Sequence, residues 1–310
     1  MSNLKIKILA PATIANMVCG FDILGMAINN PQDVMEMQLN NTGNIVITHT
    51  DNYNLPTQPT KNVAGVALLA LQKNLASKTI GFNVTINKII KPGSGLGSSA
   101  ASAAGAVVGA NYLLNKIFNN NQLVEFAMHG EELASGVKHA DNITPCIFGG
   151  VTLIRSSNPL DIIPLPAPPL FVTVVHPQIE IKTSDARQIL RKEVSLKNAI
   201  TQWGNVAGLV AGLLQNNYPL IARSLNDVII EPVRSVLING FATVKNNSLA
   251  CGALGGGISG SGPSIFMLSK TLITAQHVET EMKNIYTKMG LNFYTYVTTI
   301  NNNGVIIEEI

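Results

Sequence analysis

The sequence is poor in charge. Only 13% of its 310 residues are charged, and 21 basic against 18 acidic side chains give a formal net charge of +3. The Lys and Arg residues are scattered, without a cluster that could follow a nucleic-acid backbone or an anionic membrane surface. We therefore expect neither nucleic acid nor a membrane as a partner. Hydrophobic residues make up 46% of the chain, which excludes a disordered protein and predicts large cores.

Two long stretches, 92–115 and 202–222, contain no Asp, Glu, Lys or Arg. Gly, Ser and Asn interrupt the first, and Gly, Asn, Gln and Pro interrupt the second, which a bilayer interior would penalise. Both stretches are better explained as buried helices of a folded domain.

Cysteine is scarce as well. The chain has three cysteines without a CxxC spacing, and its first residues lack the apolar core of a signal peptide. These features predict a cytoplasmic protein.

The length predicts two domains. Five prolines fall within residues 158–170, a density that opposes regular helix or central strand and favours a linker. We place the boundary there, giving an N-terminal domain of residues 1–160 and a C-terminal domain of residues 161–310.

Apolar periodicity predicts the elements of each half. In the first half, strands are expected at 5–10, 34–39, 44–49, 81–90 and 148–155, and helices at 62–75, 98–114 and 121–135. In the second half, strands are expected at 171–175, 264–268 and 292–299, and helices at 184–193, 196–215, 217–226, 232–239 and 271–288. This pattern is α+β, with helices on one side of a small antiparallel sheet in the second half.

Glycine is concentrated in two segments, 93–97 and 252–262, which hold nine of the 26 glycines. Such segments let backbone amides approach a ligand, and a helix N-terminus favours phosphate, although ordinary tight turns have the same composition. A Walker-type loop is excluded because no Gly-Lys pair occurs. A G-x-G-x-x-G match within 255–260 leads into Pro and an expected strand, where a dinucleotide fold requires a helix.

Three segments together resemble the motifs of the GHMP small-molecule kinases: APATIANMVCGFDILGMAI at 10–28, PGSGLGSSAAS at 92–102 and CGALGGGISGSGPSIFML at 251–268. The resemblance implies a two-domain α+β fold, with an N-terminal ribosomal-protein-S5-domain-2-like α/β domain and a C-terminal ferredoxin-like α+β domain. It also implies ATP and Mg²⁺ as cofactors. One departure is Lys91, which stands where the family usually has Pro.

Within the family, the first motif and the segments KHADNITPCIFGG at 138–150, KTSDAR at 182–187 and EPVRS at 231–235 are similar to the homoserine kinases. That similarity implies ATP-dependent phosphorylation of the L-homoserine hydroxyl to O-phospho-L-homoserine in threonine biosynthesis. It also favours a homodimer.

The resemblance assigns site residues. For homoserine it implies Asn16, Asp22, His139, Asp141, Asn142, Thr183, Arg187 and Arg234. For ATP it implies Asn62, Lys91, Pro92, Gly93, Ser94, Gly95, Leu96, Gly97, Ser98, Ser99, Ala100 and Ala101. The catalytic residues would be Asp141, Asn142, Glu131 and Ser98, with Mg²⁺ on Ser98 and Glu131 and with Glu132 as the competing ligand.

These residue types suit a zwitterionic substrate, because an unpaired charge in a closed site costs several kcal/mol. Arg187 and Arg234 can clamp a carboxylate, and Asp22 or Asp141 can accept an ammonium group, although a single Arg is equally often a surface residue. Phosphoryl transfer has a loose transition state that needs little base catalysis. Asp141 therefore remains either a base or a substrate anchor, and Lys88 or Lys91 could neutralise phosphate charge.

Overall fold

The computed structural model describes residues 4–181 and 183–310, and the side chains of 183–185 lie outside this description. The larger of two sheets has seven strands, with the order β11-β1-β2-β4-β3, β5 paired with β2, and β6 paired with β5. All of these strands except β11 come from the first 165 residues. All pairs are antiparallel except β3 with β4. Its strands are β1 (Lys5–Ala15), β2 (Leu24–Asn40), β3 (Ile45–His49), β4 (Gly81–Asn87), β5 (Val151–Ser157), β6 (Leu160–Leu165) and β11 (Ile306–Glu309).

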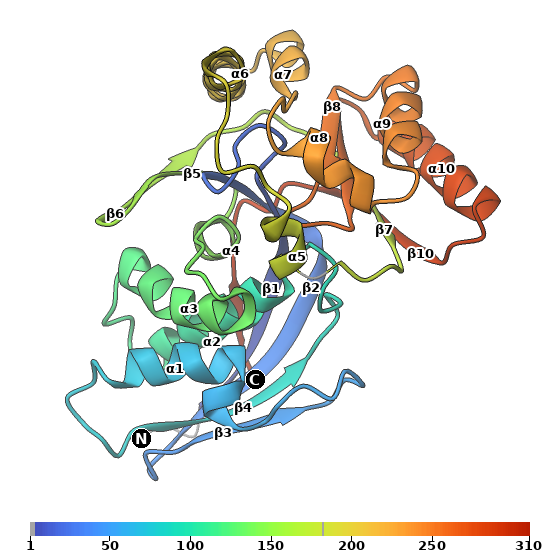
Figure 1. The fold of residues 1–310 in the computed structure, drawn as a ribbon. Coiled ribbons are helices and arrows are strands. Elements are labelled where there is room, and N and C mark those ends of the chain that lie inside the picture. Colours follow the sequence, from blue (N-terminus) through green and yellow to red (C-terminus); the bar gives the residue numbers. More distant parts are fainter. Residues whose placement is uncertain (1–3, 182) are drawn as a thin grey trace.

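Four helices of the first half cover one face of this sheet (Figure 1): α1 (Val63–Gln72), α2 (Ser98–Leu113), α3 (Asn120–Ser135) and α4 (Ile143–Phe148). A short 3-10 turn, η1 (Pro59–Lys61), precedes α1. The central helix α2 is built on Ala and Gly, and almost all of its residues are buried between the sheet and its helical neighbours. Its small side chains allow the close approach that a helix buried on all sides requires.

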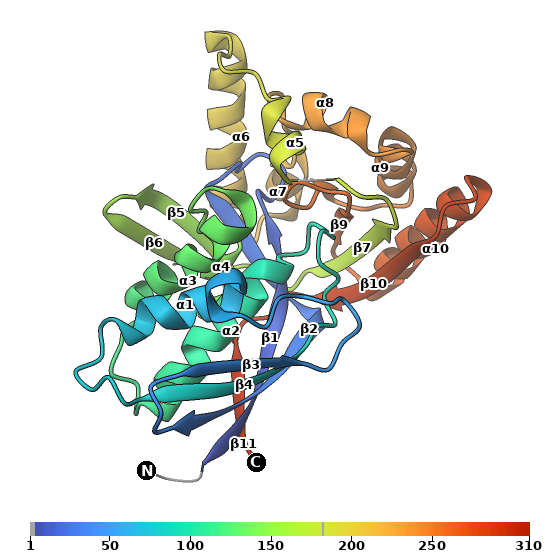
Figure 2. The same cartoon turned by 60° about the horizontal axis from the view of Figure 1, so that its bottom comes forward.

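The second half builds a four-stranded antiparallel sheet in the order β10-β7-β9-β8. Its strands are β7 (Phe171–Pro177), β8 (Gly255–Ile258), β9 (Ile265–Ser269) and β10 (Phe293–Thr299). Two helices, α9 (Phe241–Ala250) and α10 (Leu272–Lys288), pack on this sheet, while the α6–α7 pair rises beside it (Figure 2). The remaining helical elements are α5 (Thr183–Gln188), α6 (Leu196–Leu214), α7 (Tyr218–Ser224), α8 (Glu231–Arg234) and η2 (Ser235–Leu237).

Several elements differ from the sequence expectations. The strand predicted at 34–39 is the end of the much longer β2, while α4, α9 and β11 carried no recognised signal. The glycine-rich segment predicted only as a turn contains β8. Gly256 fits there because a Cβ would lie 2.0 Å from the Phe266 carbonyl oxygen on the neighbouring strand. Close strand approach explains this composition.

The chain crosses from the first sheet to the second at the proline-rich segment, but a single boundary does not separate the strands of the two sheets. β6 lies inside residues 158–170 and pairs with β5 at the edge of the first sheet, a position that tolerates proline. The last strand, β11, returns to the first sheet and pairs with β1. Residues 161–165 and 306–309 are thus structural parts of the first half, in contrast to the predicted division at 160/161.

Within the described residues, no helix is long and apolar enough to cross a membrane. The charge-free stretch 92–115 forms the loop before α2 and α2 itself, and 202–222 lies in α6 and α7. Both stretches are helical, as expected, but only the first is a buried helix. In α6 few residues are buried, and Trp203 is 62% exposed.

Candidate active site

A cavity of about 970 Å³ lies where the two halves of the chain meet, and all three sequence motifs contribute to its walls. The first motif lines it from the end of β1, the second from the loop before α2, and the third from the turn between β8 and β9. Segments more than two hundred residues apart therefore build one site.

The loop before α2 depends on three alternate glycines in the left-handed region. Gly93, Gly95 and Gly97 have φ of +75°, +79° and +68°. A Cβ on Gly97 would lie 1.9 Å from the Thr13 hydroxyl oxygen, and one on Gly95 would lie 2.6 Å from the Gly262 carbonyl oxygen. The loop thus fits closely against its neighbours and directs the N-terminus of α2 to the cavity, where unsatisfied amides favour a phosphate.

The third motif holds this loop in place. Ser259 donates its hydroxyl to the Gly95 carbonyl at 2.7 Å, and the backbone amide of Ser264 donates to the Ser94 carbonyl at 3.3 Å. The carboxamide of Asn16 donates to the Gly260 carbonyl at 3.0 Å. The rejection of a dinucleotide site in the third motif is consistent with this arrangement, because β9, not a helix, follows the glycines.

Glu131 on α3 reaches the start of α2, where it accepts a hydrogen bond from Ser99 at 2.7 Å. Burial raises the pKa of Glu131, and the hydrogen bond from Ser99 partly opposes this shift. Glu132 instead faces solvent, with 51% of its side chain exposed, and lies 3.7 Å from the Lys138 ammonium. Of the two candidates, Glu131 is the carboxylate that lines the cavity.

The serines differ from the expectation. Ser98 donates its hydroxyl to the Ile90 carbonyl at 2.7 Å, whereas Ser99 contacts Glu131. The geometry therefore pairs Glu131 with Ser99, where the sequence interpretation had chosen Ser98.

Lys88 is buried, and its ammonium group donates to acceptors within the protein. It pairs with Asp33, and it also donates to the Ser98 carbonyl at 2.7 Å and the Ser102 hydroxyl at 2.8 Å. These three acceptors match the three donors of an ammonium group. Lys88 thus fixes the first turn of α2, while Lys91 at the cavity wall donates to the Gln178 side chain at 2.5 Å.

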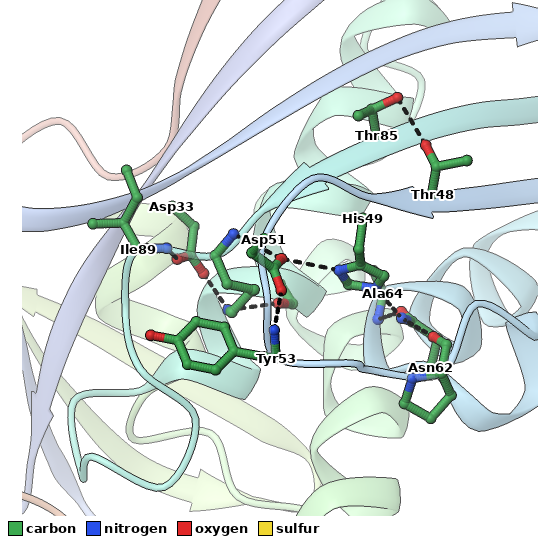
Figure 3. Close-up of polar contacts among 12 residues, drawn as sticks. Asp33, Thr48, His49, Asp51, Tyr53, Asn62, Ala64, Thr85 and Ile89 are labelled. Atoms are coloured by element: carbon green, nitrogen blue, oxygen red, sulfur yellow. Dashed lines mark hydrogen bonds and ion pairs between the residues drawn. The ribbon is translucent and has the colours of Figure 1, made fainter. Parts of the chain in front are cut away.

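Figure 3 follows a connected set of polar contacts from Asp33 towards Asn62. The Asp51 carboxylate accepts the backbone amide of Lys88 at 3.1 Å and lies 3.2 Å from His49 Nδ1. His49 Nε2 in turn lies 3.1 Å from the Asn62 carboxamide nitrogen, which also donates to the Pro56 carbonyl at 2.6 Å.

The carboxamide oxygen of Asn62 caps α1 by accepting the backbone amides of Ala64 and Gly65. Since its nitrogen and its oxygen are both engaged, Asn62 shapes the cavity wall chiefly by fixing the chain before α1.

Charged side chains meet at the other end of the cavity. Arg187 on α5 contacts both carboxylate oxygens of Asp22, at 3.0 and 2.9 Å, and His139 Nδ1 lies 3.8 Å from the same carboxylate. The guanidinium groups of Arg187 and Arg234 lie 5.6 and 4.9 Å from the centre of the Phe21 ring. The ring therefore holds two cations close together, as expected for cation–π contacts.

Arg234 is only 4% exposed, and burial lowers its pKa. Its side chain is anchored by the Ala186 carbonyl at 3.0 Å from Nε and the Gly260 carbonyl at 3.1 Å from Nη1. These partners are neutral carbonyls, and the nearby carboxylates of Asp22, Asp141 and Asp227 act on Arg234 only through their charge. The guanidinium can therefore bind an anion in the cavity.

Asp141 and Asn142 lie between the charged end and the glycine loop, just before α4. Burial raises the pKa of Asp141 from 3.8 to about 7, and the negative charges of Asp22 and Glu131 add to the shift. Asn142 accepts a hydrogen bond from the Thr13 hydroxyl at 2.8 Å. A carboxyl group that titrates near neutrality stands here beside an oriented amide.

Most of the predicted site residues line this cavity. The exceptions are Leu96, Ala100 and Ala101, which at no more than 1% exposure are core residues beneath the loop. The side chain of Thr183 lies outside the described residues. His49 and Gln178, which carry no sequence signal of their own, also line the cavity. Thr13, within the first motif but not singled out there, supports the site from behind through Asn142.

Comparison with known proteins agrees with this arrangement. The chain matches the family described as GHMP kinases N terminal domain over residues 62–150, and GHMP kinases C terminal over residues 209–288. It is 44% identical to a homoserine kinase of Chloroherpeton thalassium, covering 91% of this chain and 92% of the relative. It is 37% identical to one of Methanococcus maripaludis, covering 99% of both.

Solved structures show the same similarity. The crystal structure of homoserine kinase from Cytophaga hutchinsonii superposes with a TM-score of 0.95 at 45% identity, covering 99% of this chain and 98% of that one. Mevalonate kinase of L. major gives a TM-score of 0.70 at 13% identity over 96% of each chain, which is a likeness of fold alone.

Proposed function

Because this chain belongs to the homoserine kinases of the GHMP kinase family, it transfers a phosphoryl group from ATP to the hydroxyl of L-homoserine, and we propose how its residues do so. The product, O-phospho-L-homoserine, is a precursor in threonine biosynthesis. The residue roles below rest on the geometry of the cavity.

The observation that carries the proposal is the ion pair between Asp22 and Arg187 at the end of the cavity that also holds the glycine loop. A zwitterionic amino acid can exchange this pair for two, with its ammonium on Asp22 and its carboxylate on Arg187 and Arg234. The exchange leaves no charge unpaired, whereas a substrate with only one of the two charges would leave Asp22 or Arg187 without a partner. The site thus favours an amino acid over a sugar or a simple hydroxy acid.

The phosphates of ATP would lie at the N-terminus of α2, bound by amides of the loop Gly93–Gly97 and by its dipole. Mg²⁺ would fit beside them, because Glu131 is a buried carboxylate at the cavity wall whose pKa is raised by burial, and Ser99 is adjacent to it. We assign the metal to Glu131 and Ser99, with Ser98 as the neighbouring alternative. When bound, the ion supplies positive charge for the transferring phosphoryl group.

The substrate hydroxyl would lie near Asp141 and Asn142. At pH 7 about half of a carboxyl group with a pKa of about 7 is ionised, so Asp141 can accept a proton under ordinary conditions. A carboxyl group that is only half ionised at pH 7 is a poor partner for an ammonium group, and Asp22 is better suited to bind it. We therefore assign Asp141 as the proton acceptor and Asn142 as the residue that holds the hydroxyl in line.

An ADP-release assay with L-homoserine, mevalonate, galactose and shikimate as acceptors tests the function. We expect turnover with L-homoserine and none above background with the other three. Two truncated analogues, 4-hydroxybutyrate without the ammonium and 3-aminopropanol without the carboxylate, test the ion-pair exchange, and both should be poor substrates. Efficient phosphorylation of either analogue would contradict the roles of Asp22 and Arg187.

A further inference from the structure

Asparagine occupies the N-cap of several helices in this chain, and one of these residues departs from the pattern. Asn62, Asn119 and Asn217 each accept a backbone amide from the first turn of the helix that follows, as N-cap asparagines usually do. Asn142 occupies the same position before α4, but its side chain makes no capping hydrogen bond. The carboxamide of Asn142 is therefore used for something else.

That carboxamide is held by Thr13. The Thr13 hydroxyl donates to the Asn142 oxygen at 2.8 Å, across 129 residues of sequence. Because the oxygen is engaged with Thr13, the amide nitrogen is directed away from it, and Asn142 lines the cavity. A carboxamide without this partner could rotate by 180° and present its oxygen to the cavity instead.

Thr13 is itself a rigid support. It is fully buried in β1, opposite Ala27 of β2, and its backbone amide donates to the Leu96 carbonyl at 3.1 Å. Its hydroxyl also lies where a side chain on Gly97 would be, so it touches the loop at the N-terminus of α2. One side chain thus relates the position of Asn142 to that of the glycine loop.

We propose that Thr13 is a positioning residue for phosphoryl transfer, whose hydroxyl orients the Asn142 carboxamide with its donor towards the reacting groups. The inference rests on the proposed role of Asn142. A misoriented carboxamide would place its oxygen, an acceptor, beside the negatively charged phosphates and the substrate oxygen. Stabilisation of the transition state would then fall more than the binding of either substrate.

The test is a kinetic double-mutant cycle. Thr13→Val removes the hydroxyl with little change of volume, Thr13→Ser retains it, and Asn142→Ala removes the group on which Thr13 acts. Thr144→Val is the control, because Thr144 is equally buried and hydrogen-bonds Thr152 at 2.7 Å outside the cavity. Thermal unfolding and KM for both substrates are measured for each variant.

We expect Thr13→Val to lower kcat about tenfold or more, the size of one lost hydrogen bond, with each KM changed less than about threefold. Thr13→Ser should recover most of kcat, and Thr144→Val should lower thermal stability without this loss of kcat. In the Asn142→Ala background, Thr13→Val should have almost no further effect on kcat.

An equal loss of kcat in both backgrounds would overturn the proposal, because Thr13 would then act independently of Asn142. A wild-type kcat for Thr13→Val would overturn it as well. If Asn142→Ala itself keeps wild-type kcat, the role of Asn142 in the proposed mechanism fails, which is a separate outcome from a failure of Thr13 to act through it.

Discussion

The buried carboxyl of Asp141 should make the protein less stable as pH rises, and Asp141→Asn should remove that dependence. The pKa of Asp141 is raised from 3.8 to about 7 in the folded protein, chiefly by burial and further by Asp22 and Glu131. Below pH 3.8 the group is protonated in both the folded and unfolded states, so it does not lower the free energy of unfolding. As pH rises from 3.8 to 7 the unfolded state ionises first, so the free energy of unfolding falls, and the loss is complete above pH 7.

The size of the effect follows from the two pKa values. A difference of this magnitude corresponds to about 4 kcal/mol of lost stability above pH 7. Over the accessible range from pH 5 to pH 8, the change is about 2 to 3 kcal/mol. An amide of similar shape does not ionise, so Asp141→Asn carries none of this penalty.

Urea unfolding followed by circular dichroism at pH 5, 6, 7 and 8 measures the effect. The stability of the variant minus that of the wild type should grow by about 2 to 3 kcal/mol from pH 5 to pH 8. Most other titrating groups are common to both proteins and cancel in the difference. Glu132→Gln, which removes a carboxylate from the exposed side of α3, controls for the loss of one negative charge.

A difference that stays constant with pH would refute the reasoning. It would mean that Asp141 ionises in the folded protein as easily as in the unfolded chain, and the assignment of a base poised near neutrality would lose its physical basis. The same variant should lower kcat strongly with KM for homoserine little changed, and a dominant rise in KM would indicate an anchoring role instead.

Three further predictions concern the charges and the glycine loop. Arg187→Ala should raise KM for homoserine at least tenfold and KM for ATP far less in steady-state assays, and equal effects on both would contradict its role. Glu131→Gln should raise the Mg²⁺ concentration needed for half-maximal activity, and an unchanged Mg²⁺ titration would exclude it as a ligand. Gly97→Ala should abolish ATP binding or folding. Position 97 has a φ of +68°, and the new Cβ would lie 1.9 Å from the buried Thr13 hydroxyl oxygen. Gly136→Ala, at φ of +78° with no atom within 4 Å, should cost only about 1 kcal/mol of backbone strain in thermal unfolding.

The sequence predicts the glycine loop well because its information is local. Alternate glycines at 93, 95 and 97 permit left-handed backbone, and the small residues after them favour a closely packed helix; the structure has both. The charged site residues were assigned through the resemblance to the kinase family, and the rarity of charge in this chain supports the same residues. In contrast, the choice between Ser98 and Ser99 depends on the rotation of α2, since neighbouring side chains on a helix point about 100° apart.

Contacts between distant segments were not accessible in this way. In the sequence, Thr13 is an ordinary strand residue, and its role depends on the fold that brings Asn142 to its hydroxyl. Only four residues form β11, too few to show a strand period before they pair with β1. Lys88 illustrates the same limit for charge. Its sequence position near the loop suggested a phosphate ligand, but Asp33 and the first turn of α2 take up its donors.

A charge that binds in the cavity can change the pKa of Asp141. After burial, the largest causes of the raised pKa of Asp141 are the negative charges of Asp22 and Glu131. A cation on Glu131 would cancel one of those charges, and the pKa of Asp141 would then fall. Asp22 is already paired with Arg187 and would exchange that partner for the substrate ammonium, so its effect on Asp141 would change little. At pH 7 Asp141 would become a more fully ionised proton acceptor when the cation is in place, whereas about half of it would be neutral, and less costly to bury, when the cation is absent.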